Sequence, residues 1–276
     1  MKFELPETQS AQSKPETNLP TVGLNIEKLP SRNLAYPKNC EISYTPYSLG
    51  EVKQISKSKN MSTKDRIHKI ASGIICTGHS VKDLTVPDLT YIGMLRQIST
   101  LGTPKVVLNY VCAKCGEKGR HIVDVQNDLE FDDLLIKYGD EASLPIEGEF
   151  SFGVVQFRPL TVKQYLKMLQ NGQEHDEIAK LANESNLPFD EAVKKFSDTK
   201  NVTDMRLLDA IDRLLFHGLK PIRFECKNKE EDGSTCGNRI AIELDGGQAL
   251  LLPFRESNDD IENLINIGSK VKYKSD

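Results

Sequence analysis

Hydrophobic and polar positions follow the same order twice along this chain. Residues 42–55 begin with alternating apolar residues, which predict a strand, and continue through Pro46 and Ser48 into a segment that predicts an amphipathic helix. Residues 155–168 repeat this order, with Thr161 where the first half has Ser48. A hydroxyl side chain at this place can accept a hydrogen bond from the first turn of the following helix. The pattern therefore predicts strand, hydroxyl cap and helix in both halves.

The order continues with a short connector and a second helix in each half. Residues 80–98 end in a run whose apolar positions recur at helical spacing, and residues 201–210 predict the matching connector before a helix over 211–216. Gly102 and Gly218 follow these helices, and glycine most readily adopts the left-handed conformation that ends a helix. We therefore expect both helices to stop at a glycine.

A β-hairpin with a pair of cysteines at its turn is predicted at the end of each half. Apolar runs over 106–110 and 221–225 lead into the cysteines, runs over 120–125 and 239–244 follow them, and a short helix is expected over 259–267. The shared order of landmarks indicates an internal repeat. The sequence thus predicts an α+β fold of two related strand-helix-hairpin halves, joined by a zinc-ribbon-like site of four cysteines.

The predicted organisation has three parts. Residues 1–34 are rich in Pro, Ser, Thr, Asn and Glu, which is typical of a disordered arm or of a strap that orders on a partner, with 21–26 as its docking segment. Residues 35–148 form the first half. Residues 149–276 form the second half, which carries a helical insertion over 173–198.

Length, charge and cysteine content narrow the class of protein. At 276 residues the chain can bury two ordinary cores, and its net charge of -4 favours protein partners over nucleic acid. Its apolar runs are too short to span a bilayer, and its first residues lack the apolar segment of a signal peptide. We therefore expect a cytoplasmic location, where six cysteines favour metal binding or free thiols over disulfides.

Four of the cysteines give the strongest chemical signal. Cys112 and Cys115 stand in a Cys-x-x-Cys-Gly sequence, and Cys226 and Cys236 also end in Cys-Gly, at a wider spacing. Four thiolates are a ligand set of structural Zn²⁺, and a glycine after the second cysteine eases the turn around the metal. We interpret the four as one zinc site. Four ordinary reduced thiols, or disulfides within the pairs, are the alternatives.

Other candidate residues have simpler explanations. His121 lies close to Cys115 in sequence and could replace a cysteine as ligand, but an exposed histidine at a strand edge explains it as well. Cys40 and Cys76 have no close cysteine neighbour in sequence, so we expect buried or partly buried thiols without a function of their own.

The sequence favours a protein that is not an enzyme. It contains no G-x-S-x-G, P-loop or H-E-x-x-H motif and no dinucleotide-binding fingerprint. A site closed by four cysteines leaves the metal no position for a reacting water. The loops around the cysteine pairs mix charges, as in Glu117 beside Lys118 and Lys229 beside Glu230, so nucleic acid is not the expected partner.

One part of the chain resembles a known family. Residues 29–51, the helix over 89–98 and the Cys-x-x-Cys-Gly sequence at 112–116 resemble the baseplate hub family of T4-type bacteriophages. The resemblance covers residues 29–135 and reaches the second half through the internal repeat alone. It implies a virion or assembly protein of a contractile tail, in the central hub of the baseplate or helping to form it, without enzymatic activity.

The expected function combines this resemblance with the zinc site. We expect a non-enzymatic structural or assembly protein of a phage baseplate hub, in the host cytoplasm during assembly or in the tail of the virion. Its partners would be other tail and baseplate proteins, contacted through the N-terminal arm and the insertion, with no membrane contact. Cys226 and Cys236 are more widely spaced than Cys112 and Cys115, so the two pairs are not symmetric. Two separate cysteine features, in place of one shared four-cysteine site, are therefore an alternative. The alternative function is a zinc-ribbon adaptor for nucleic acid or transcription.

Overall fold

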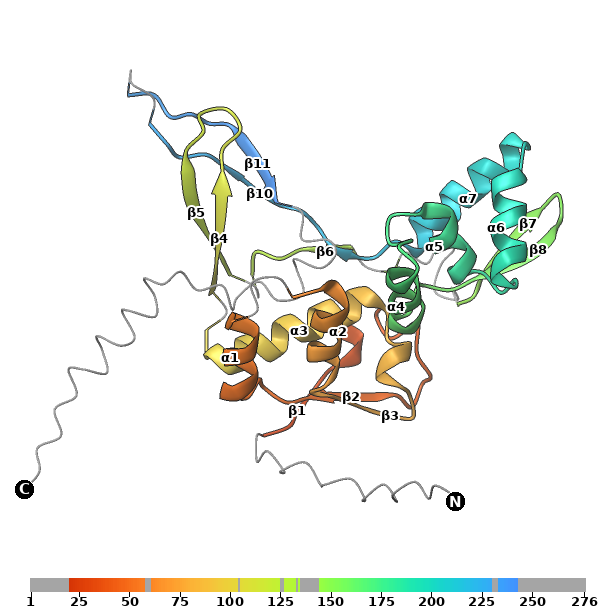
Figure 1. The fold of residues 1–276 in the computed structure, drawn as a ribbon, viewed down its shortest axis with the longest axis horizontal. Helices are drawn as coiled ribbons and strands as arrows, with labels where there is room; N and C mark the ends of the chain where they lie inside the picture. Colours follow the sequence, from red (N-terminus) through yellow and green to blue (C-terminus); the bar gives the residue numbers. More distant parts are fainter. Residues whose placement is uncertain are drawn as a thin grey trace, which may run out of the picture.

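The computed structural model shows a mixed helix-and-strand protein built from three bodies (Figure 1). We call them the N-terminal body, the helical body and the hairpin lobe. The structure describes residues 20–57, 61–103, 105–124, 127–132, 134, 144–229 and 233–242. The helix predicted over 259–267 lies outside these residues.

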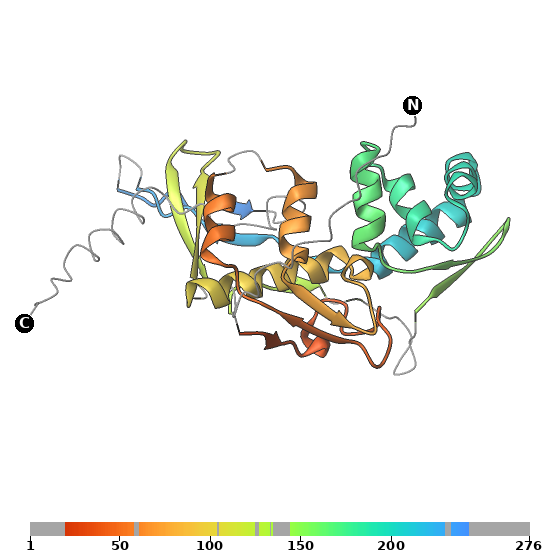
Figure 2. The same ribbon diagram turned by 60° about the horizontal axis from the view of Figure 1, so that its bottom comes forward.

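The N-terminal body is a small antiparallel sheet with helices on one face (Figures 1 and 2). The sheet has the order β1-β2-β3, with β1 (Val22–Gly23), β2 (Glu41–Tyr44) and β3 (Ile74–Thr77). The helices are α1 (Leu49–Lys57), α2 (Thr63–Ala71) and α3 (Val86–Leu101), with 3₁₀ turns at Ile26–Lys28 and Val81–Asp83. Ile67, Leu89 and Ile92 are fully buried between them.

The predicted arm over residues 1–34 is shorter than expected. Residues 1–19 lie outside the described residues, but Val22 pairs with Tyr44 in the sheet and Leu29 is buried at 1% exposure. The segment 21–26 therefore contacts the chain's own strand β2. The polar composition of the arm hid these few apolar residues, which the sheet and core accommodate.

Helix α4 (Val162–Gln170) packs on the N-terminal body, although it belongs to the second half of the sequence. Val162 and Leu166 lie in the apolar core of that body, and the Val162 N–H donates to the Leu84 carbonyl at 2.8 Å. The cores of the protein therefore do not follow the predicted boundary between residues 148 and 149.

The helical body combines a hairpin with three helices. Its elements are β7 (Ile146–Phe150), β8 (Gly153–Phe157), α5 (Glu177–Glu184), α6 (Phe189–Asp198) and α7 (Val202–Leu215). Phe150, Phe157 and Phe196 form an aromatic cluster in its core. Helices α5 and α6 occupy the predicted insertion over 173–198.

Two predictions about α7 were wrong. The connector expected over 201–210 is helical from Val202, because the Asn201 side chain accepts a hydrogen bond from the Thr203 N–H and caps the helix there. The helix ends at Leu215, and Gly218 instead opens strand β9 (Gly218–Leu219), which pairs with β6 (Phe131–Asp132). In the first half, Gly102 ends α3 in the left-handed conformation, as predicted.

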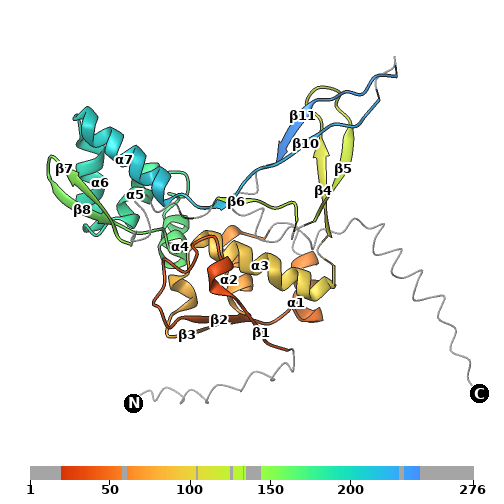
Figure 3. The same cartoon turned by 180° about the vertical axis from the view of Figure 1, so that it is seen from behind.

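The hairpin lobe consists of two separate two-stranded sheets that project together from the N-terminal body (Figures 1 and 3). One hairpin joins β4 (Lys105–Val111) to β5 (Lys118–Asp124), and the other joins β10 (Ile222–Glu225) to β11 (Arg239–Ile242). Leu108, Val123 and Ile222 pack with Met94 of α3, which fixes the base of the lobe. The cysteines lie at the far ends of both hairpins.

Candidate metal centre

The first cysteine pair lies in a tight turn between β4 and β5. The Cys112 N–H donates to the Glu117 carbonyl at 2.9 Å, and the Gly116 N–H donates to the Cys112 carbonyl at 2.8 Å. Gly116 has φ of 72°, a conformation that side chains with a Cβ rarely adopt. The cysteine pair thus lies at the turn of a hairpin, as the sequence predicted, and the Sγ atoms of Cys112 and Cys115 lie within 4.8 Å of each other.

The second pair forms a similar turn despite its wider spacing. The Cys226 N–H donates to the Asn238 carbonyl at 2.9 Å, and the Gly237 N–H donates to the Cys226 carbonyl at 3.2 Å. Gly237 has φ of 61°. Between the two cysteines the chain makes an excursion closed by an antiparallel bridge from Lys229 to Thr235. Both cysteines therefore keep backbone hydrogen bonds equivalent to those of the first pair.

The four Sγ atoms converge across the two hairpins. All lie within 4.8 Å of one another, with Cys112 to Cys236 at 3.9 Å and Cys115 to Cys226 at 3.8 Å. A tetrahedral Zn²⁺ with Zn–S bonds of about 2.3 Å separates its sulfurs by about 3.8 Å. A disulfide would need about 2.05 Å, and these cysteines are free thiols. The donor set therefore fits one metal ion that bridges the hairpins, and the disulfide alternative does not apply.

Amide groups surround the sulfurs. The Asn238 side-chain amide donates to Cys112 Sγ at 3.4 Å, the Asn228 amide lies 3.8 Å from Cys115 Sγ, and Lys114 Nζ donates to the Cys236 carbonyl at 3.1 Å. Such donors orient ligands and stabilise negative sulfur. The sequence analysis missed both asparagines, although each follows a cysteine of the second pair by two residues and so repeats a Cys-x-Asn pattern.

The thiols differ in acidity although they share one site. A hydrogen bond from the Cys115 backbone N–H, helped by those from Lys114 and the Asn238 amide, lowers the pKa of Cys112 to about 6 against the effect of burial. The Asn228 and Asn238 N–H groups act in the same direction on Cys226 and Cys236, yet burial and the neighbouring thiols raise both pKa values, that of Cys236 to about 11. Adjacent thiolates repel one another, and a divalent cation among them supplies the opposing charge.

Aromatic residues pack within the lobe, and one of them, Tyr110, packs against the cysteine cluster. Tyr110 lies across Gly119 on the neighbouring strand, where a Cβ would lie 2.4 Å from the tyrosine ring. His121 stacks on Phe224 with ring centroids 3.8 Å apart, and burial lowers its pKa. His121 is therefore a packing residue of the lobe and does not belong to the four-sulfur cluster.

The remaining cysteines lie in the N-terminal body. Cys40 is buried and Cys76 is half-buried, both in or against its apolar core, as the sequence predicted. Burial raises the pKa of both thiols, that of Cys76 to about 11. Neither belongs to the metal centre.

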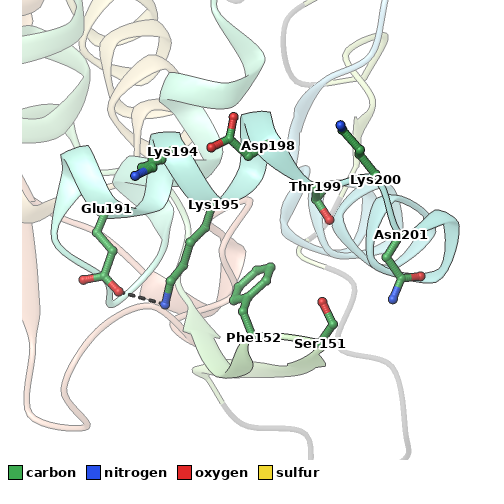
Figure 4. A pocket seen from close by; sticks show the side chains of 9 residues that line it. All are labelled: Ser151, Phe152, Glu191, Lys194, Lys195, Asp198, Thr199, Lys200 and Asn201. Carbon is green, nitrogen blue, oxygen red and sulfur yellow. Dashed lines mark ion pairs between the residues drawn. The ribbon is translucent and has the colours of Figure 1, made fainter.

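A groove of about 540 Å³ in the helical body mixes opposite charges (Figure 4). It lies between α6 and the turn that joins β7 to β8. Lys195 forms an ion pair with Glu191 at 2.8 Å and lies over the Phe152 ring, 5.3 Å from its centroid. Ser151 donates its hydroxyl and backbone N–H to the buried carboxylate of Asp204. These contacts hold the β7–β8 turn against the helices.

Comparison with models of protein families, with curated proteins and with solved structures finds no match to this chain. In the described part of the chain, no helix combines the length and the apolar character that crossing a membrane requires.

Proposed function

We propose that the chain binds one structural Zn²⁺ through Cys112, Cys115, Cys226 and Cys236 and acts as a non-enzymatic structural or assembly protein. The observation that carries the proposal is the convergence of four Sγ atoms within 4.8 Å from hairpins that are distant in sequence. Four protein sulfurs complete a tetrahedral site and leave no position for water or substrate. The metal would therefore hold the hairpins together and take no part in a reaction.

The small size of the lobe supports this role for the metal. A two-stranded hairpin is marginally stable alone, and the buried apolar core that the lobe shares with α3 consists of Met94, Leu108, Val123 and Ile222. Small bodies with so little apolar burial are commonly stabilised by a metal or by disulfides. A metal shared between the two hairpins would cross-link them at the end opposite to this core.

We also infer that the two halves descend from one repeated unit. The central strand of each half is paired on both sides at equivalent places: Tyr44 pairs with Val22 and Ile74, and Phe157 pairs with Ile146 and Ser185. The residue after each central strand also makes a matching backbone hydrogen bond. The Thr45 N–H donates to the Gly73 carbonyl, and the Arg158 N–H donates to the Glu184 carbonyl.

The helices support the same inference. Ser48 with Glu51 and Thr161 with Gln164 form reciprocal caps at the start of α1 and α4. Helices α3 and α7 each carry a buried aspartate in the first turn, which accepts a serine N–H from outside the helix: Asp88 from Ser31 and Asp204 from Ser151. In the proposed repeat, the start of α3 therefore corresponds to the start of α7. This correspondence replaces the one between residues 80–89 and 201–210 that the sequence had suggested.

The assignment to a contractile-tail baseplate hub rests on the resemblance of residues 29–135. An exposed apolar surface on the helical body is compatible with a role in assembly. Val202 and Met205 lie one turn apart on α7 and are 59% and 48% exposed. Exposed apolar residues grouped on one helix face are suited to contact with another protein.

Metal analysis of the purified chain tests the zinc proposal. We expect one equivalent of zinc per chain, and loss of that zinc in both Cys112→Ser and Cys226→Ser. Cys76→Ser is the matched control, because its thiol is half-buried outside the cluster, and it should keep the metal. If Cys112→Ser lost zinc and Cys226→Ser kept it, the shared site would be wrong.

Purification from infected cells tests the assembly proposal. A tagged chain is expected to bring tail and baseplate proteins with it, in amounts that survive a wash at high salt. A chain that elutes without tail proteins would contradict the proposal, whatever its metal content.

A groove on the β4–β5 hairpin favours one second candidate, a zinc-ribbon adaptor for nucleic acid. Tyr110 lines this groove together with Lys118 and Arg120, and an aromatic ring beside basic side chains suits a nucleic-acid strand. A salt-dependent mobility shift on RNA or DNA, weakened by Lys118→Glu, would support the adaptor. No shift at low salt would remove it.

A further inference from the structure

A second cavity, of about 450 Å³, lies where the N-terminal body meets the helical body. It is formed by the start of α3, by α4 and α5, and by the residues that follow α7. In Figures 1 and 3 helix α4 lies between these two bodies, with α5 next to it. Much of the cavity wall is apolar, from Val86, Pro87, Leu160, Met168 and Leu215.

A buried carboxylate lines this cavity. Glu184, at the end of α5, is 5% exposed, and its Oε2 atom has no hydrogen-bond partner among the described residues. The nearby Lys180 ammonium donates to Asp212 at 2.6 Å and so is held toward α7. A buried carboxylate oxygen without a partner is costly, which is why such atoms usually meet a cation or a donor.

The other polar groups at the cavity make it acidic. Glu174, Asp176 and Glu177 line it together with Glu184. The buried His217 is fully engaged, since its Nδ1 contacts the Leu215 carbonyl at 2.8 Å and its Nε2 contacts Thr85 Oγ1 at 3.1 Å. Burial also lowers the pKa of His217, so the ring adds no positive charge near neutral pH.

We propose that this cavity receives a lysine or arginine side chain of a partner protein. The aliphatic stem would lie against Met168 and Leu215, and the cationic end would meet Glu184. Long basic side chains bury their stems on apolar surfaces and direct their charge to a carboxylate, so both parts of the cavity are used. The inference rests on the proposed assembly function, with partner proteins contacted through the helical insertion as the sequence led us to expect. It depends on neither the metal nor the assignment to a phage.

The surroundings of the cavity favour a polypeptide over a free amine. Phe216 lies at its edge and is 53% exposed. A small cation inside the cavity would leave this ring in water, whereas a polypeptide that presents a basic side chain would cover it. Burial also raises the pKa of Glu184 to about 7, against the opposing charge of Lys180, and a second cation would stabilise the ionised form.

Methyl NMR of the full-length chain tests the proposal directly. Met168 lines the cavity, and its methyl resonance should shift on titration with the capped peptide Gly-Gly-Lys-Gly-Gly, while that of Met61 should not. The matched peptide carries norleucine in place of lysine and keeps the stem without the ammonium. It should bind at least about tenfold more weakly, because only the charged peptide can donate to the unpartnered Oε2 atom of Glu184.

Substitution of the carboxylate completes the test. Glu184→Gln keeps the shape of the side chain. It should lower the affinity for the lysine peptide by at least about tenfold, to the affinity of the norleucine peptide. Glu191→Gln, an exposed carboxylate of α6, is the control and should bind within about twofold of wild type. Equal binding by the two peptides, or an unchanged affinity in Glu184→Gln, would overturn the proposal.

A titration with free 1,5-diaminopentane distinguishes a small free amine from a basic side chain of a protein as the ligand of the cavity. If it shifts Met168 and the lysine peptide does not, the cavity takes a small amine and the assignment to a partner protein is wrong. Because these titrations use the purified chain, their failure is distinct from a failure to recover tail proteins from infected cells.

Discussion

The N-terminal body and the hairpin lobe solve the same problem with different means. Both contain short antiparallel strands that need support from outside the strand pair. The N-terminal body covers its sheet with helices and buries a continuous apolar core around Ile67, Leu89 and Ile92. Among its described residues the lobe has few buried apolar side chains, and it ends in four convergent thiols. Strands of similar length are therefore supported by an apolar core in one region and end at a candidate metal centre in the other.

The N-terminal body also contains a buried cation of its own. Arg96 is fully buried, and its guanidinium donates to the carbonyls of Thr45, Lys69 and Ile70. It also lies over the Tyr47 ring at 3.9 Å from the centroid. This side chain ties the end of α2 to the residue after β2. In the lobe the equivalent tie would come from a metal ion.

Loss of one of the four cysteines should produce the largest difference in stability between the lobe and the N-terminal body. Structural zinc contributes about 10 to 16 kcal/mol of apparent binding free energy in small zinc domains, so Cys112→Ser should unfold the lobe. Hydrogen exchange should show lost protection at Leu108 and Ile222 and retained protection at Ile67. If Ile67 lost protection equally, the two regions would be one cooperative unit.

Removal of the buried arginine should have the opposite pattern. Arg96→Met removes the charged donor to the carbonyls of Thr45, Lys69 and Ile70 and should destabilise the N-terminal body by about 3 to 5 kcal/mol, measured by urea unfolding. Zinc content should stay at one equivalent per chain. Arg213→Met is the control, because the Arg213 side chain is 77% exposed and pairs only with Asp209 among the described residues, so its effect should be under about 0.5 kcal/mol.

The junction between the bodies should carry a pH dependence that comes from Glu184. Burial raises the pKa of Glu184 from its usual 4.5 to about 7. The positive charge of Lys180 lowers this pKa, and the negative charge of Asp212 raises it further. The unfolded chain therefore releases this proton first as pH rises, and folding loses about 3 kcal/mol between about pH 4.5 and 7. Glu184→Gln should remove this loss.

Urea unfolding at pH 5 and pH 8 measures that difference. Wild type should lose more stability than Glu184→Gln between the two values, so the variant is expected to be the more stable protein at pH 8. The same slope in both proteins would assign the pH dependence to other groups.

The helix caps should give the smallest and most similar effects. Ser48→Ala and Thr161→Ala each remove the hydroxyl that accepts the N–H of the third helical residue, at a cost of about 1 kcal/mol. Similar values are expected in thermal unfolding, because the two caps hold equivalent places in the proposed repeat. A difference above about 1 kcal/mol would show that their surroundings have diverged.

Local features of this fold could be predicted from the sequence with good reason. The cap at Thr161, the turn glycines Gly116 and Gly237, and the two helices of the insertion follow from residue preferences that act over a few positions. The four cysteines were also identifiable, because thiolates in pairs that end in Cys-Gly have few other uses in a chain with this cysteine content.

Errors arose where a distant partner decided the outcome. Residues 20–34 were expected to be part of an arm because their composition is polar, yet Leu29 is buried in the core of the N-terminal body. Gly218 was expected to end a helix, yet its pairing with Asp132 makes it part of a strand. The buried Glu184 gave no sequence signal, since a glutamate at the end of an amphipathic helix is normally exposed.

The sequence by itself thus determined the four cysteines of the candidate metal centre, the glycine turns beside them and most of the helices. These depend on side-chain chemistry and on backbone preferences within a few residues. Only the tertiary structure decided between one shared set of four sulfurs and two separate cysteine features, and only it showed that α4 packs on the first half and that Glu184 lines a cavity between two bodies. Those outcomes depend on which apolar surfaces bury one another, and that choice is made between segments distant in the chain.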